Sequence, residues 1–261
     1  MYTLDYNKYL KHNKIIVFLL TYLSYSSLHI ARKIFSNIKN NLTDQWNFSE
    51  NFLAKLDTTF MSAYGFGLIL NGYFADKHGS KPLMVCCLIG TSLFFFTFPL
   101  LKVMGIESKG IYYAIWILNG FFQSMGWPST VNIMSKWFEK EFHSFVFGIW
   151  ASNASIGNIL GNIIISICQK YNLHIMTIFA IPTVILFILS ILSYCFIIQE
   201  PDKQYFEVHV PEPNIDSLHS NSTYIHIYQH KRKIRLNNIS YNDNNNNKSN
   251  ILVYALSFLF L

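Results

Sequence analysis

Residues 72–81 read Gly-Tyr-Phe-Ala-Asp-Lys-His-Gly-Ser-Lys, a short charged segment with a long apolar run on either side. The run before it covers residues 56–74, and the run after it covers residues 83–104. Each run is close to the roughly 20 apolar residues that a helix needs to cross a bilayer. Gly79 permits a tight turn, because glycine adopts backbone conformations that other residues avoid. This segment therefore predicts a hairpin of two transmembrane helices.

Four further apolar runs of similar length cover residues 15–35, 111–134, 145–168 and 175–198. A shorter run, 251–261, reaches the last residue and is too short to span a bilayer. We expect the chain to be either a fragment or an abnormal gene product. The predicted fold class is an all-α membrane protein, a six-helix N-terminal bundle plus the start of a truncated seventh helix.

The composition agrees with a membrane protein. Hydrophobic residues make up 51% of the chain and charged residues 13%, whereas about 25% of a typical soluble domain is charged. The formal net charge is +6, and the basic residues lie between the apolar runs, as membrane topology requires. We therefore expect the lipid bilayer as a partner and no nucleic acid, and the sequence leaves protein partners unknown.

The four cysteines lie inside apolar runs, and none stands at metal-ligand spacing from a histidine. We expect no disulfide and no metal site. The sequence also carries no P-loop, no H-E-x-x-H motif and no Ser-His-Asp arrangement, so we predict no catalytic residues, no cofactor and no enzymatic activity.

The charges and composition between the runs predict the domain organisation. Most Lys and Arg residues fall on the side that holds the N-terminus, which the positive-inside rule makes cytoplasmic. Residues 1–14 are then a cytoplasmic tail and residues 15–198 the six-span bundle. Residues 199–250 are polar and Asn-rich, which is typical of a disordered cytoplasmic linker. The sequons at Asn41 and Asn47 fall on the opposite side, where glycosylation is an open question.

One face of the first run is polar, because Tyr22, Tyr25, His29, Arg32 and Ser36 recur at helical spacing. An arginine inside a membrane helix costs roughly 2.5–3.5 kcal/mol on insertion scales, so it needs a partner or a wet cavity. Its guanidinium fork suits phosphate. From these residues alone, the alternative that the arginine extends to the luminal interface is equally good.

The fourth and fifth runs also carry polar and small residues. Gly126 and Pro128 around Trp127 predict a bent helix. Gly157 and Gly161 form a close-packing motif. Trp150 and Asn153 continue the face of these glycines and are candidates to meet substrate, although helix packing alone also explains this pattern.

The opening segment resembles the signature G-x-x-x-D-R/K-x-G-x-R/K of the major facilitator superfamily. That resemblance implies a role in conformational change for Gly72, Asp76, Lys77, Gly79 and Lys81. Residues 24–33, 56–60, 119–129 and 148–161 look like the organophosphate:phosphate antiporter family, and specifically like its eukaryotic sugar-phosphate exchangers. This likeness covers nearly all of residues 15–200.

The resemblance implies that Arg32 binds phosphate together with an arginine in the seventh span. It also places six further residues at cavity positions: Tyr25, His29, Tyr64, Gln123, Trp127 and Trp150. We add Asn153, because it lies on the same face of the fifth run as Trp150. The chain departs from bacterial relatives at Leu68, where they have lysine, and near Asn153, where a histidine is expected.

The implied function is exchange of a sugar phosphate or glycerol 3-phosphate for inorganic phosphate by alternating access, in the endoplasmic reticulum membrane. No Asp or Glu lies in the middle of a span, which favours anion exchange over proton symport. The alternatives are a facilitator of another small solute and a truncated, non-transporting membrane protein.

Overall fold

The computed structural model describes residues 2–201, and these residues form helices without strands. The predicted linker beyond Pro201 and the seventh apolar run lie outside the described residues. The helices are α1 (Tyr2–Trp46), α2 (Glu50–His78), α3 (Ser80–Val103), α4 (Lys109–Ser124), α5 (Gly126–Trp137), a 3₁₀ turn (Lys140–Phe142), α6 (His143–Ala151), α7 (Asn153–Lys170) and α8 (Ile175–Phe196).

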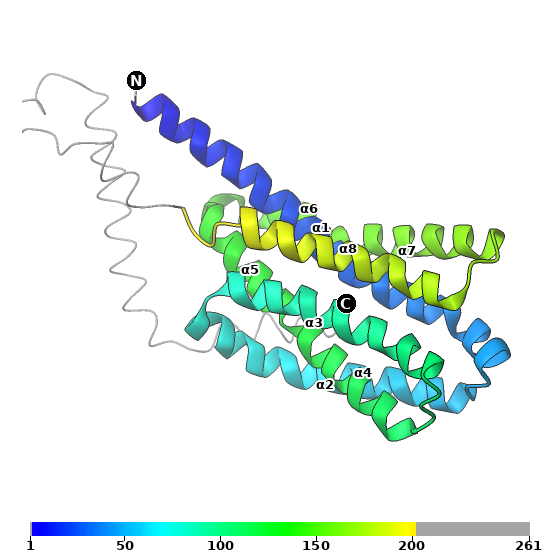
Figure 1. The fold of residues 1–261 in the computed structure, drawn as a ribbon. Helices are drawn as coiled ribbons and strands as arrows, with labels where there is room; N and C mark the ends of the chain where they lie inside the picture. Colours follow the sequence, from blue (N-terminus) through cyan, green and yellow to red (C-terminus); the bar gives the residue numbers. More distant parts are fainter. Residues whose placement is uncertain (1, 202–261) are drawn as a thin grey trace, which may run out of the picture. The chain divides into compact units, whose positions relative to one another are not determined.

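Residues Tyr9–Pro201 form one compact unit in which the helices lie side by side (Figure 1). They make six crossing segments, because α4 continues into α5 and α6 into α7, and the six predicted spans coincide with these segments. Four segments are long and apolar enough by themselves to cross a membrane: Lys8–Trp46, Ser80–Val103, His143–Lys170 and Ile175–Phe196. The crossings formed by α2 and by α4–α5 fall outside this group. Met125 divides the latter into helices of 16 and 12 residues.

Aromatic side chains from four helices fill the centre of the bundle. The ring of Phe35 on α1 lies 4.3 Å from that of Trp116 on α4, and Phe98 on α3 lies 4.9 Å from the same indole. Phe179 on α8 lies 5.0 Å from Phe95. All five side chains are buried. Such pairs each add about 0.5–1.5 kcal/mol beyond their buried area, and packing of this kind holds helices together where lipid is the solvent.

Glycines let α7 lie directly against α1. A methyl group on Gly157 would collide with the carbonyl oxygen of Ser26, and one on Gly161 would lie 2.8 Å from Cβ of Lys33. The close packing expected from these two glycines is therefore present. It fixes α7 beside the polar face of α1.

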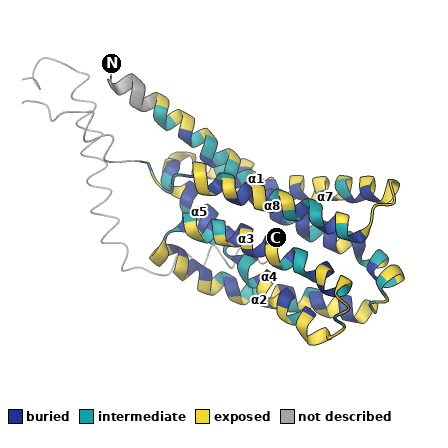
Figure 2. Cartoon of the chain, viewed as in Figure 1, coloured by how far each residue is buried: buried dark blue, intermediate teal, exposed yellow. Residues whose placement is uncertain are grey.

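The outer faces of the bundle are exposed, as Figure 2 shows along α2, α7 and α8, and many of the exposed side chains are large and apolar. Phe66, Ile69 and Tyr194 are each at least 60% exposed. Large apolar side chains with this degree of exposure would be costly in water. In a bilayer they contact lipid, which is consistent with an integral multi-pass membrane protein.

Candidate functional site

Arg32 lies on the inner side of α1 and is half-buried. Its Nε donates a hydrogen bond to Oε1 of Gln123 on α4. Its guanidinium carbon lies over two rings of α2, 4.4 Å from the centroid of Tyr64 and 5.4 Å from that of Phe60. The guanidinium thus has an aromatic surface beneath it and one neutral acceptor at its edge. Arg32 does not extend freely to the interface.

A second group of side chains adjoins this arginine through Tyr25. The Tyr25 hydroxyl lies 3.2 Å from that of Tyr64, and the Tyr25 ring lies 5.4 Å from His29. The same ring lies 5.7 Å from Trp127 and 5.3 Å from Trp150. The two indoles are 5.5 Å apart. Four crossing segments therefore contribute to one aromatic and cationic cluster.

The two crossing segments that supply the tryptophans are both interrupted beside this cluster. α4 ends at Ser124 and α5 begins at Gly126, next to Trp127, as expected for a helix bent at Gly126 and Pro128. α6 ends at Ala151 and α7 begins at Asn153, and this second interruption was not expected from the sequence. Interrupted spans at the membrane midplane are a feature of transporter binding sites.

Hydrogen bonds hold the second interruption in place. The Ser152 hydroxyl donates to the carbonyl oxygen of Ile149 at 2.7 Å and lies 2.8 Å from the Tyr22 hydroxyl. The Asn153 amide donates to the carbonyl oxygen of Trp150 at 2.6 Å, and the backbone carbonyl of Asn153 accepts from Ser26 at 3.1 Å. Asn153 thus serves local structure. Its Oδ1, like Nε1 of Trp150, is buried without a partner among the described residues.

The structure brings the eight predicted substrate-binding residues into this one cluster: Tyr25, His29, Arg32, Tyr64, Gln123, Trp127, Trp150 and Asn153. Their roles toward a substrate remain predictions. Two further residues, Phe60 and Cys87, contribute to the cluster and were not predicted from the sequence. Phe60 lies one helical turn before Tyr64, and that i, i+4 spacing was the available signal. Cys87 donates to the carbonyl oxygen of Gln123 at 3.6 Å, a contact without a sequence signal.

None of the carboxylate side chains that the structure describes pairs with Arg32. Lys39 pairs instead with Asp57, and Lys102 lies 3.9 Å from Glu107. The same part of the chain holds no group of His, Cys, Asp and Glu suited to a metal ion. The site therefore offers an anion a positive charge that no described acidic side chain neutralises.

The signature segment forms the turn between α2 and α3. Gly79 has φ +89°, and a methyl group there would lie 2.7 Å from Oε1 of Gln199. Asp76 accepts a hydrogen bond of 3.2 Å from Asn132 on α5, Gly72 is buried, and Lys77 is exposed.

The chain just after α8 crosses this same end of the bundle. The backbone N–H of Lys81 donates to Gln199 at 3.5 Å, and the Trp137 indole donates to the carbonyl oxygen of Ile198 at 2.7 Å. Lys136 lies 3.8 Å from Glu200. We call residues 197–200 the strap. The strap connects the turn at Gly79 to α5, a link that no sequence pattern indicated.

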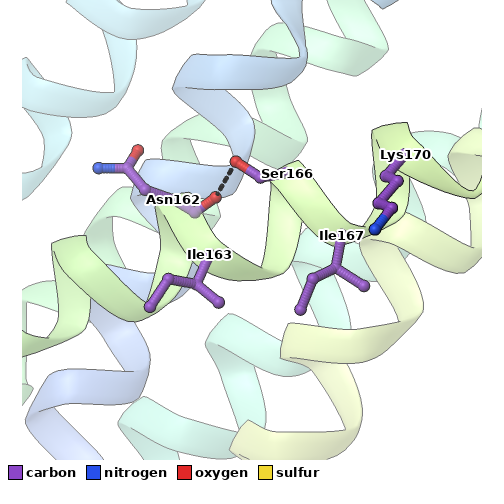
Figure 3. A pocket seen from close by; sticks show the side chains of 5 residues that line it. All are labelled: Asn162, Ile163, Ser166, Ile167 and Lys170. Carbon is purple, nitrogen blue, oxygen red and sulfur yellow. Dashed lines mark hydrogen bonds between the residues drawn. The ribbon is translucent and has the colours of Figure 1, made fainter.

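A shallow hollow lies elsewhere, on the outer surface of α7 (Figure 3). It is lined by five exposed residues of this one helix: Asn162, Ile163, Ser166, Ile167 and Lys170. Asn162 also accepts a 2.7 Å hydrogen bond from Asn37 on α1. The hollow contains none of the predicted site residues.

Residues 16–260 match the family described as the Major Facilitator Superfamily. The chain is 32% identical to sugar phosphate exchanger 3 of Gallus gallus over 233 residues, which are 78% of this chain and 45% of that protein. It is 35% identical to the Homo sapiens protein of the same name over 61% of this chain and 38% of that protein. It is 28% identical to putative glycerol-3-phosphate transporter 5 of Arabidopsis thaliana over 75% of this chain and 42% of that protein. The chain thus spans less than half the length of these relatives.

Proposed function

This chain belongs to the Major Facilitator Superfamily, and we propose that its bundle is the N-terminal half of an antiporter that exchanges an organic phosphate for inorganic phosphate. The names of the relatives support this class of substrate, a sugar phosphate or glycerol 3-phosphate. The matched parts make up only 45% and 38% of two of these relatives. In the proposal, a C-terminal half completes the translocation path.

The observation that carries the proposal is the environment of Arg32. It lies within a membrane-spanning helix, over the Tyr64 ring, and no described carboxylate neutralises it. A cation in a low-dielectric setting binds anions more strongly than one in water. The planar guanidinium also matches the oxygens of a phosphate group with two parallel hydrogen bonds.

In this proposal, the charge of Arg32 faces a second half of the transporter, and alternating access depends on it. We propose that phosphate bound at Arg32 neutralises it and lets the halves close, with an arginine of the seventh span completing the clamp. The turn at Gly79 and the Asp76–Asn132 contact would then change during that motion. Other cluster residues, among them Tyr25, Trp127 and Trp150, would line the space for the organic part of the substrate.

The bundle is an integral membrane protein, and we propose the endoplasmic reticulum membrane with a cytoplasmic N-terminus. The distribution of basic residues supports this orientation. In the same proposal, the residues after Pro201 form a cytoplasmic linker between the halves.

Counterflow of labelled phosphate in proteoliposomes tests the proposal directly, using the protein that contains this chain together with its C-terminal half. Arg32→Ala should abolish both phosphate self-exchange and organophosphate-driven counterflow, because the anion loses its cationic partner. Lys55→Ala, at an exposed position of α2, should leave both unchanged. Normal exchange by the Arg32 variant, or uptake that only an unphosphorylated sugar inhibits, would contradict the proposal.

A further inference from the structure

We infer that Gln123 is a positioning residue, whose side-chain oxygen holds Nε of Arg32 so that the two terminal nitrogens are presented together to a phosphate group. The inference rests on the proposed function, in which Arg32 binds phosphate. It gives Gln123 a role different from that of a ligand for the organic part of the substrate.

The hydrogen bond between these residues uses one edge of the guanidinium. A guanidinium carries five N–H donors, of which one is on Nε and four are on the terminal nitrogens. Gln123 accepts from Nε, and Arg32 takes part in no ion pair with a described side chain. The terminal pair, the part of the group that matches two phosphate oxygens in parallel, stays available.

Two aromatic rings restrain the Arg32 guanidinium in a second direction. The guanidinium carbon is 4.4 Å from the Tyr64 ring centroid and 5.4 Å from that of Phe60. Contact with a ring face restrains the out-of-plane motion of the guanidinium. The Nε bond restrains rotation within the plane. The long arginine side chain, which otherwise loses considerable rotamer freedom on binding, is thereby held in one orientation before the anion arrives.

Gln123 is itself well fixed. Its side chain is 1% exposed, and its backbone carbonyl accepts from the Cys87 thiol at 3.6 Å. It lies in the last turn of α4, just before the interruption at Met125. A bend at that point therefore changes where the Gln123 amide oxygen lies. It thereby changes the orientation of the two terminal nitrogens of Arg32.

Two kinds of exchange separate positioning from direct substrate contact. Phosphate self-exchange involves no organic group, whereas exchange of phosphate for glycerol 3-phosphate does. Gln123→Leu removes the acceptor at similar volume. If Gln123 acts through Arg32, the KM for phosphate in self-exchange and the KM for glycerol 3-phosphate should both rise by about tenfold, because both anions use the same guanidinium. The maximal rate should change much less.

Asn71→Leu is the matched control, since Asn71 is a fully buried amide of α2 that also bonds to α4. Its amide nitrogen donates to Ser124 at 2.8 Å and to the carbonyl oxygen of Phe121 at 3.3 Å, away from Arg32. This variant should lower thermal stability without raising either KM. If Gln123→Leu fails to accumulate in the membrane, Gln123→Asn gives the same readouts, because its shorter amide falls short of Nε.

A KM that rises for glycerol 3-phosphate while phosphate self-exchange stays normal would overturn the positioning role in favour of a direct contact. An equal rise in the Asn71 control would assign the effect to general destabilisation and would overturn it too. Absence of phosphate self-exchange in the unmodified protein is a separate result, which would remove the proposed function itself.

Discussion

Tyr64 shows how one side chain serves both parts of the candidate site. Its ring lies under Arg32 and its hydroxyl reaches Tyr25, which in turn contacts both tryptophans of the cluster. The ring supplies a cation–π contact, which is worth about 0.5–2 kcal/mol depending on desolvation. The hydroxyl supplies a polar link within an otherwise aromatic group.

Substitution at Tyr64 should separate these two contributions. Tyr64→Leu removes the ring, so the KM for phosphate should rise by roughly two- to thirtyfold. Tyr64→Phe keeps the ring and loses the 3.2 Å contact with Tyr25, so the KM should change less than threefold. Initial rates of phosphate self-exchange give both values. Equal effects of the two substitutions would show that the ring contact contributes nothing.

At the scale of helices, the close approach of neighbouring helices at the site depends on small residues and on interrupted segments. α7 lies against α1 because Gly157 and Gly161 leave space. On the same crossing segment, Trp150 lies beside Tyr25 and Asn153 beside Ser26. The interruptions at Met125 and Ser152 occur in the two segments that supply the tryptophans. Geometry at the site is therefore set by helix packing as much as by the site residues themselves.

Gly157→Ala should separate α7 from α1. The added methyl group meets the backbone carbonyl of Ser26, which cannot move aside as a flexible side chain can. Overpacking of this kind typically costs about 1–3 kcal/mol, so the midpoint of thermal unfolding in detergent should fall by several degrees. Gly148→Ala is the control on the same crossing segment, since nothing lies within 4 Å of its added carbon. Equal midpoints for the two variants would refute the close contact.

Gly79→Ala tests the turn that the strap covers. Its φ of +89° with ψ of 151° lies in a region that is nearly restricted to glycine, at a cost of about 1–3 kcal/mol for other residues. The added carbon would also press on Gln199 at 2.7 Å. We expect lower stability together with a slower maximal exchange rate.

Gly105→Ala is the comparison for Gly79→Ala. Its φ is also positive, at +72°, but nothing lies within 4 Å of the added carbon. This variant should lose stability and keep its exchange rate per folded molecule. An equal loss of rate in both variants would argue against a specific role of the Gly79 turn in the conformational cycle.

For the whole molecule, the apolar outer faces and the unneutralised charge of Arg32 support the same conclusion. The exposed apolar side chains suit a lipid environment, and the Arg32 guanidinium lies inside the bundle against the Tyr64 ring. It spans less than half the length of its relatives. We therefore treat transport as a property of this bundle combined with a second half.

The proposed orientation makes a prediction about the two ends of the bundle. Lys77 and Lys109 are both exposed, and an odd number of crossings separates them. In sealed microsomes, with Cys86 and Cys195 replaced beforehand, an impermeant maleimide should label Lys77→Cys and spare Lys109→Cys until detergent is added. Those two native thiols are the exposed ones of the described chain. The reverse labelling pattern would invert the topology.

The sequence by itself determined the membrane class, the six crossings, the turn at Gly79 and the presence of a cation in the first span. These features follow from local properties: the length of apolar runs, the backbone freedom of glycine and the chemistry of a single side chain. It also predicted the residues that now form one cluster, through their helical spacing and the family resemblance.

Only the tertiary structure decided how those residues meet. The contact of Arg32 with Gln123 joins positions 91 residues apart. The contributions of Phe60, Cys87 and the strap also depend on helix packing and were not predicted from the sequence. The break at Ser152 has neither glycine nor proline next to it, so local sequence rules gave no sign of it. The sequence left two locations open for the Arg32 side chain, the luminal interface and the interior of the bundle. The choice between them depends on where the neighbouring side chains lie. Only packing between separate helices determines that position.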